Sequence, residues 1–369
     1  MVYASRAIAC LASTLIAFGF FAHALYAQEL HQENRGVFRA EVTEIKKTES
    51  RIIPGTQTPT TIQTLEARIL EGEQKGRIIT VENDFLTLEE GDRFFLNYLV
   101  TIDNEGIYIV GEADRTQALY FFVGLFALAV ILFGGLKGVR SLLSLAISFG
   151  ILFYFLLPAL LSGVSPLLAS TGYSILILTV AIFLTHGFKR VSLSALLGTI
   201  LTIGFTTLLA SLAVKATRLT GFSDDASTYL NLGTRGILDF QGLLLGAIII
   251  GVLGVLDDIA ITQAVTVHEL RRAAPDLSKY ELFMRAYRMG REHIAALINT
   301  LALAYTSVAL PLLLLFMGAE APFTQLINRE IFATEIIRTI VGSVGIILAV
   351  PITTIFAVAF LPQDTVLTK

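Results

Sequence analysis

The sequence has no tryptophan, a single cysteine and few charges for its length. The lone cysteine, Cys10, excludes a disulfide framework and a metal site built on several thiolates. Only 15% of the residues are charged and 54% are hydrophobic, which is more apolar residue than a soluble globular protein of this size needs. A formal net charge of −3 argues against nucleic acid as a partner. We therefore expect a membrane protein whose main partner is the lipid bilayer.

Known catalytic and nucleotide-binding motifs are also missing. No P-loop, nucleophile elbow, HExxH or GxGxxG pattern stands in a plausible context. The sequence therefore predicts that the protein is not an enzyme, is not an ATP-driven pump by itself, and carries neither a cofactor nor a bound metal. A membrane enzyme acting on lipid would lack a recognisable catalytic set.

Residues 1–27 predict a signal peptide. Arg6 precedes a short apolar run, and small residues follow, so that cleavage would come after Ala24 or Ala27. The alternative is an uncleaved N-terminal anchor, although the apolar run is short for a membrane span.

Residues 28–115 change character and predict a small β domain. In the segment 65–69, apolar and charged residues alternate at every step, which is the period of a β-strand. Five short strands are expected: Gly36–Ile45, Thr61–Leu70, Arg77–Val81, Arg93–Val100 and Ile107–Val110. Such a set is typical of a small antiparallel barrel of the OB kind. We expect a scaffold or a protein-binding domain, because neither an aromatic stacking row nor a basic groove is present.

Residues 116–369 predict a bundle of about seven transmembrane helices. The apolar runs lie at about 117–136, 141–161, 166–187, 191–214, 237–267, 293–317 and 333–361. Each run is long enough for a hydrocarbon core of about 30 Å.

The distribution of charge predicts the orientation of these helices. If the β domain lies outside, the turns near 137–140 and 186–190 and the loop 270–292 lie inside, and all three are basic. The C-terminus is then cytoplasmic. The pattern of Ser278 and Glu281 predicts a capped helix within the loop, either a basic amphipathic helix on the membrane surface or a solvated connector.

Two adjacent aspartates, Asp257 and Asp258, interrupt the fifth apolar run. A carboxylate at the centre of a bilayer costs roughly 2.5–3.5 kcal/mol on insertion scales, so it needs a partner, a watery cavity or a function. On a helical wheel, Asp258 shares a face with Gly251, Gly254 and Thr262, whereas Asp257 points to another side. The two glycines predict a close helix–helix contact on the Asp258 face. Alternatively, both aspartates end the span in headgroup water.

The next apolar run carries polar residues at a similar predicted depth. Asn299 and Thr306 are seven residues apart and therefore share one helix face. Next to a buried Asp258, they could support proton exchange or cation ligation through oxygen atoms. Alternatively, they form hydrogen bonds that only hold the bundle together. His293, at the start of this run, is expected at the membrane interface and not as a ligand.

The motifs of this half resemble those of the YibE/F-like bacterial membrane proteins. The resemblance rests on the segment 251–263, which reads GVLGVLDDIAITQ, on the HEL at 268–270 and on GREHIAALINTLALAY at 290–305 with LPLLLLF at 310–316. It covers about 134–362 and implies a multi-pass membrane protein, some relatives being described as permeases.

A more local resemblance concerns mechanism. Gly254 and Asp258, followed by an apolar turn, Glu269 and two arginines, are similar to the fourth-helix pattern of RND and SecDF-type proteins. That resemblance implies a membrane aspartate that carries protons, and only Asp258 falls at the matching position. The chain departs from those proteins in its span count and in the lack of a second extracytoplasmic loop domain.

Two functional hypotheses follow. The first is a proton- or cation-coupled secondary transporter in which Asp258 carries the ion, supported by Asp257, Thr262, Asn299 and Thr306. The alternative is a non-transporting envelope scaffold or export accessory that binds a protein partner through its extracytoplasmic β domain. The substrate and the oligomeric state stay open, with a homo-oligomer among the options.

Overall fold

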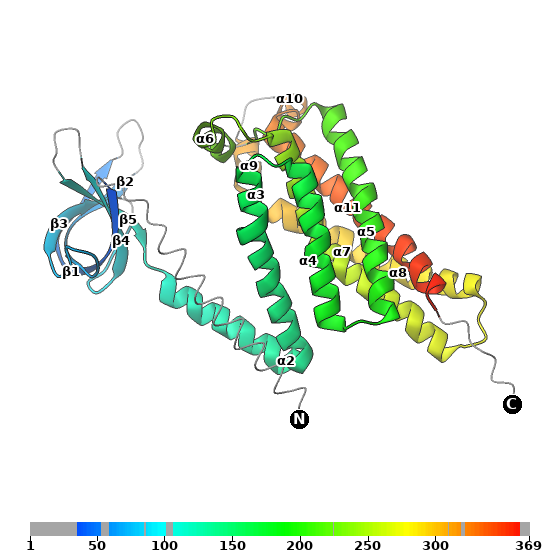
Figure 1. Ribbon diagram of the computed structural model, residues 1–369. Coiled ribbons are helices and arrows are strands. Elements are labelled where there is room, and N and C mark those ends of the chain that lie inside the picture. Colours follow the sequence, from blue (N-terminus) through cyan, green and yellow to red (C-terminus); the bar gives the residue numbers. More distant parts are fainter. Residues whose placement is uncertain are drawn as a thin grey trace. The chain divides into compact units, whose positions relative to one another are not determined.

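The computed structural model describes residues 35–52, 59–84, 86–100, 106–223, 225–308, 310–318 and 322–361. The chain divides into two compact units, Met1–Ala129 and Val130–Lys369. Figure 1 shows strands in the first unit and a helical bundle in the second. The predicted signal peptide or anchor at 1–27 and the C-terminal residue lie outside the described residues.

The first unit contains one five-stranded antiparallel sheet, with the strand order β3-β2-β1-β4-β5. The strands are β1 (Arg35–Ile52), β2 (Pro59–Ile69), β3 (Ile78–Asn83), β4 (Arg93–Val100) and β5 (Gly106–Ala113). All five predicted strands are therefore confirmed, and β1 is longer than expected. Its pairing with β2 is interrupted by two register shifts, which bend the strand.

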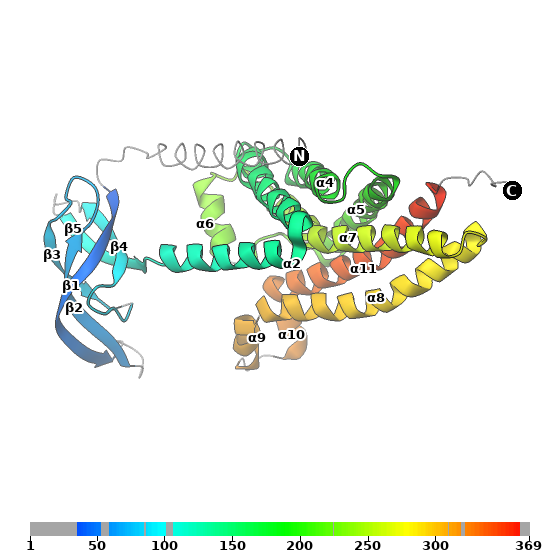
Figure 2. The same cartoon turned by 90° about the horizontal axis from the view of Figure 1, so that it is seen from below.

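The core of the sheet follows from the alternation along β2. Leu65, Ala67 and Ile69 are buried, while the charged residues between them are not. They pack with Phe94 and Leu96 of β4 in one apolar cluster. The sheet curls into a half-barrel, as Figure 2 shows from a second side.

The two outer strands of the half-barrel approach each other. Arg77, just before β3, donates a hydrogen bond of 3.4 Å to the hydroxyl of Tyr108 in β5. Its guanidinium also lies over the Tyr108 ring. The strand order and this contact fit a small barrel, but closure into a full OB-like barrel stays a prediction.

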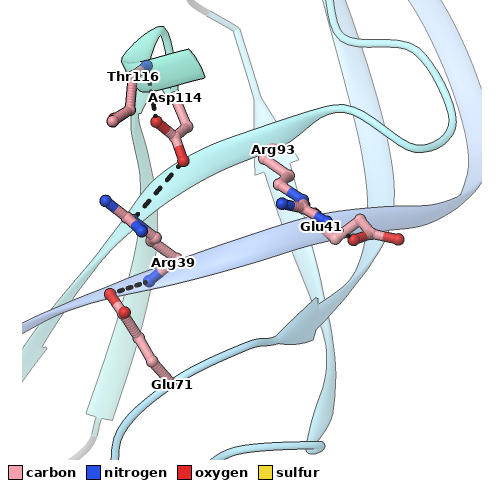
Figure 3. Close-up of polar contacts among 6 residues, drawn as sticks. All are labelled: Arg39, Glu41, Glu71, Arg93, Asp114 and Thr116. Atoms are coloured by element: carbon pink, nitrogen blue, oxygen red, sulfur yellow. Dashed lines mark hydrogen bonds and ion pairs between the residues drawn. The ribbon is translucent and has the colours of Figure 1, made fainter. Parts of the chain in front are cut away.

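An acidic residue joins the end of the sheet to the first helix, α2 (Thr116–Ile151). The Asp114 carboxylate accepts a hydrogen bond of 3.0 Å from the backbone N–H of Thr116 and lies 3.6 Å from Arg39 Nε (Figure 3). The backbone N–H of Arg39 in turn donates to Glu71. The hydrogen bonds from Thr116, followed by the charges of Arg39 and Arg93, hold the Asp114 pKa below its ordinary value of 3.8.

Helix α2 reverses direction at Gly135, whose φ of 55° and ψ of −138° are accessible only to glycine without strain. A Cβ at Gly138 would lie 2.2 Å from the carbonyl oxygen of Val130. In a straight helix these two residues would be about 12 Å apart along the axis. The chain therefore folds back on itself within a few residues, without a loop.

The second unit is a bundle of helices, most of them long and apolar. They are the later part of α2 with η1 (Leu152–Leu156) and α3 (Leu157–Leu161), α4 (Pro166–His186), α5 (Arg190–Thr217), α7 (Phe240–Ala273), α8 (Lys279–Val308), α9 (Leu310–Met317) and α11 (Glu330–Ala359). Short helices α6 (Asp225–Gly233) and α10 (Phe323–Ile327) lie between them.

Five helices among the described residues are long and apolar enough to cross a membrane. The segment Thr116–Leu161 is one of the five, although it covers two of the predicted spans. Helix α8 is not among them, because its first half is charged. The expected number of seven spans is therefore not confirmed.

Reciprocal contacts between glycine and threonine bring α5 and α11 together. A Cβ at Gly198 of α5 would lie 2.5 Å from Thr353 Oγ1 of α11, and one at Gly345 of α11 would lie 2.7 Å from Thr206 Oγ1 of α5. Small residues allow helix backbones to approach closely in membranes. The resulting close contact is next to the large apolar core that α7 shares with these two helices.

We expect Asp114→Ala to lower the free energy of unfolding of the sheet by roughly 1–2 kcal/mol at neutral pH, because it removes the acceptor of the Thr116 N–H and the partner of Arg39. Since the folded-state pKa of Asp114 is lowered, this stabilisation is present above pH 3.8 and is lost as the pH falls further. Urea unfolding followed by deuterium exchange of strand peptides, at neutral pH and below pH 3.8, measures the difference in stability between the variant and the unchanged protein. Glu112→Ala, at an exposed ion pair, is the matched control and should change stability by less than about 0.5 kcal/mol. Equal losses of stability in Asp114→Ala and Glu112→Ala would contradict the stabilising role given to Asp114.

Candidate functional site

The aspartate pair lies in α7, the central helix of the bundle. The helix begins at Phe240 because the Asp239 side chain accepts a hydrogen bond of 2.9 Å from the N–H of Gly242. It ends after Arg271 and Arg272, which suit the negative end of the helix dipole. At 1.5 Å per residue its length is about 50 Å, more than a hydrocarbon core requires. It contacts α4, α5, α8 and α11 (Figure 2).

Asp257 is the more enclosed of the two aspartates. Its side chain is half-buried, and one carboxylate oxygen, Oδ1, is buried without a hydrogen-bond partner among the described residues. Buried polar atoms in proteins are nearly always hydrogen-bonded, so an exception needs an explanation.

Asp258 is exposed and belongs to an open stripe along α7. Gly251, Gly254 and Thr262 are exposed on the same face. The wheel therefore predicted correctly that these four residues share a face and that Asp257 points elsewhere. The burial pattern is the reverse of the expected one, since the enclosed residue is Asp257.

The two glycines of this stripe have different surroundings. A Cβ at Gly251 would lie 2.9 Å from the hydroxyl of Tyr305 in α8, so a neighbouring side chain does approach there. A Cβ at Gly254 would meet no described atom within 4 Å. Close helix contacts occur instead at other glycines, among them Gly246, which faces Ser170 of α4, and Gly290 of α8, which faces Gln263 and Val350.

Two histidines from other helices act electrostatically on Asp258. His186 at the end of α4 and His293 in α8 both interact electrostatically with its carboxylate. The sequence predicts His293 only at the membrane interface. The spacing of residues along the chain contains no sign of these contacts, because each histidine lies on a different helix.

The polar residues predicted on α8 are not in hydrogen-bond contact with the aspartates in the described structure. Asn299 and Thr306 are both exposed on α8. The hydroxyl of Thr306 donates to the carbonyl of Ala302 in its own helix at 2.7 Å. The group on α8 that interacts with Asp258 is His293, one to two turns before Asn299.

The start of α8 confirms the predicted cap. The hydroxyl of Ser278 accepts from the N–H of Glu281, and the Glu281 carboxylate accepts from the N–H of Ser278. Leu282 and Ala286 are fully buried in the bundle core. The segment predicted as a basic loop is thus formed mainly by the end of α7 and the start of α8, and its apolar face packs on the bundle.

Gln263 is a buried polar residue that the sequence analysis did not select. Its side chain is 4% exposed, and its amide nitrogen donates to the carbonyl of Ala286 at 2.9 Å and to Thr354 Oγ1 at 2.7 Å. The amide thereby joins α7 to α8 and α11. Its spacing in the sequence could have indicated burial, because Gln263 lies on the same helix face as the buried residues Leu256 and Val267.

Within the described part of the chain, no group of three or more His, Cys, Asp or Glu side chains could hold a metal ion. The carboxylates of the aspartate pair can bind a proton, or a cation through their oxygen atoms.

The composition of the bundle and the aspartate motif agree with a comparison against protein families. A family model described as "YibE/F-like protein" matches residues 122–363. The chain belongs to the YibE/F-like family. The matched range includes every residue of the aspartate site and leaves the five-stranded sheet outside. No curated protein and no solved structure shows significant similarity to this YibE/F-like chain.

We expect Gln263→Ala to lower the melting temperature of the detergent-solubilised YibE/F-like protein. Each interhelical hydrogen bond in a membrane contributes about 0.6 kcal/mol on average, and the substitution removes two and leaves a cavity. Gln325→Ala, at an exposed position of α10, should leave the melting temperature unchanged. Thermal unfolding of the purified proteins tests this, and equal stability of the two variants would show that the three-helix contact is dispensable.

Proposed function

We propose that this YibE/F-like protein is a proton- or cation-coupled secondary transporter of the bacterial inner membrane. The observation that carries the proposal is a buried Asp257 oxygen, without a hydrogen-bond partner among the described residues, next to an accessible Asp258 in the central helix. An ionised carboxylate without a partner is costly in an apolar surrounding and is neutralised by a proton or a cation. The two aspartates are therefore suited to bind and release a proton or a cation in turn.

The two aspartates have complementary environments. Asp258 is accessible and interacts with His186 and His293. Histidine exchanges protons near neutral pH and commonly acts as a proton shuttle. In this proposal, Asp258 exchanges the ion with the histidines or with water, and Asp257 holds it inside the bundle. Thr262, Asn299 and Thr306 line the exposed faces of α7 and α8 and would supply oxygen atoms near this path.

The proposal includes a topology of seven crossings with the sheet outside and the C-terminus in the cytoplasm. The reversal at Gly135 supports two crossings within the long first helical segment. The residues Lys137, Lys189 and Arg272, from three segments that the charge distribution assigns to the inside, line one cavity. The position of these three residues at one end of the bundle supports the placement of their segments on the same side of the membrane.

We expect Asp257→Asn and Asp258→Asn to reduce proton uptake at least about tenfold in proteoliposomes under an imposed membrane potential, because an amide cannot carry the ion. A trapped pH-sensitive dye reports the uptake. Asp276→Asn, the same change at an exposed residue between α7 and α8, is the matched control and should behave as the unchanged protein. An infrared difference spectrum of the carboxyl stretch gives a second reading that needs no substrate. Unchanged uptake and an unchanged carboxyl band in both aspartate variants would sink the proposal.

An observation on the sheet favours a second candidate, an envelope scaffold or export accessory. Val37, Ile107 and Ile109 are exposed, and the pairing of β1, β4 and β5 places them on one face of the sheet. Exposed apolar side chains gathered on one surface are typical of protein contacts.

Deletion of 28–115 separates the two candidates. A transporter should keep part of its flux without the sheet, whereas a scaffold should lose its partner in pull-down experiments. The double substitution Ile107→Thr and Ile109→Thr should weaken partner capture while the sheet stays folded. Thr80→Ser, at an exposed position of β3, is the control. Full partner capture by the deletion variant would refute the scaffold candidate.

A further inference from the structure

A cavity at one end of the bundle has the features of an anion site. Its volume is about 420 Å³, within the roughly 300–1,000 Å³ typical of small-molecule sites. It lies between the reversal of α2, the end of α4, the start of α5 and the last turns of α7. All of these segments belong to the second compact unit.

The charge of the cavity wall is strongly positive. Lys137, Arg140, Lys189 and Arg272 line it, together with His186 and His268. Glu269 is the acidic residue of the lining, and it lies 3.4 Å from Arg272. Among the ion pairs of the described residues, none involves Lys137, Arg140 or Lys189. These three cations of the cavity wall therefore have no carboxylate partner among the described residues.

The N-terminus of α5 adds hydrogen-bond donors to the same wall. The preceding residue, Lys189, has an extended backbone, and no side chain caps the helix. The N–H groups of the first turn have no acceptor within a helix, and the dipole of this 28-residue helix places positive potential there. Val191 and Ser192 of this turn line the cavity. A helix start of this kind is a ready anion site.

Ser192 gives an independent sign of a ligand. Its side chain is only 1% exposed, and its hydroxyl oxygen is buried without a hydrogen-bond partner among the described residues. The same residue lines the cavity. A buried hydroxyl without a partner is rare in proteins, and a bound oxyanion would accept its proton in a hydrogen bond.

We propose that this cavity binds a phosphate group, held by the Lys137, Arg140 and Lys189 cations, the α5 N-terminus and the Ser192 hydroxyl. A phosphate group offers several acceptor oxygens and up to two negative charges, which matches a wall of many donors. His186 lines this cavity and also acts on Asp258, but none of the groups proposed to hold the phosphate belongs to the proposed ion path.

Two sources could provide this group, a phospholipid headgroup or free phosphate. The exposed ring of Phe188, next to Lys189, stacks on Phe183 of α4 and would suit contact with lipid. Basic pockets between membrane helices commonly bind the headgroups of anionic lipids. Both sources share the same chemistry at the site, so the experiment has one arm for each.

The test uses the full chain, purified in detergent, and the variants Arg140→Gln with Lys189→Gln, and Ser192→Ala. Lys215→Gln, at the opposite end of α5, is the matched control. In the first arm, the proteins are exchanged into nanodiscs of phosphatidylethanolamine with or without cardiolipin, and bound lipid is counted by native mass spectrometry. In the second arm, inorganic phosphate is titrated into the delipidated proteins by calorimetry.

Binding in either arm that weakens at least about tenfold in the double variant, and by a smaller factor in Ser192→Ala, supports the site. The control should bind as the unchanged protein. Retained lipid with no calorimetric signal assigns the site to a headgroup, and the opposite result assigns it to free phosphate. Thermal unfolding shows that the variants are folded. The absence of binding in both arms, or equal binding by the double variant and the control, would overturn the proposal.

Discussion

The close contact between α5 and α11 is the constraint on which the bundle depends. Gly198 faces Thr353, and Gly345 faces Thr206, so each helix offers a glycine to a threonine of the other. In a membrane, the hydrophobic effect gives little drive for association, and packing at small residues replaces it. Helix α7 shares the apolar core beside this pair, and the amide of Gln263 joins it to α8 and α11. The orientation of Asp257 into the bundle follows from that placement of α7.

The sequence predicted the elements of this protein better than their contacts. The alternation around Leu65 and Ile69 identified a strand because its two faces differ in burial. The apolar runs located the long helices, and the basic turn predicted at 137–140 directly follows the reversal of α2 at Gly135. The number of crossings depends on that reversal and on α8, so it could not be derived from hydropathy alone.

The faces of the membrane helices were harder to predict, for a physical reason. A helix without a distinct polar side gives little sign of its orientation, and α4, α5 and most of α7 are of this kind. The wheel could separate Asp257 from Asp258 because adjacent residues always diverge on a helix. It could not show which of them would be enclosed. The roles of His186, His293 and Gln263 could not be predicted, because they arise only from interactions between different helices.

The reversal at Gly135 also has a consequence for the cationic cavity. Lys137 and Arg140 follow the glycine by two and five residues, with no loop between them and the turn. Their backbone is therefore fixed before any ligand arrives, and little conformational entropy remains to be lost when an anion is bound. A longer, flexible connection would have given the same charges without this preorganisation. In this family member, a turn without a loop thus lies where rigidity would most favour recognition.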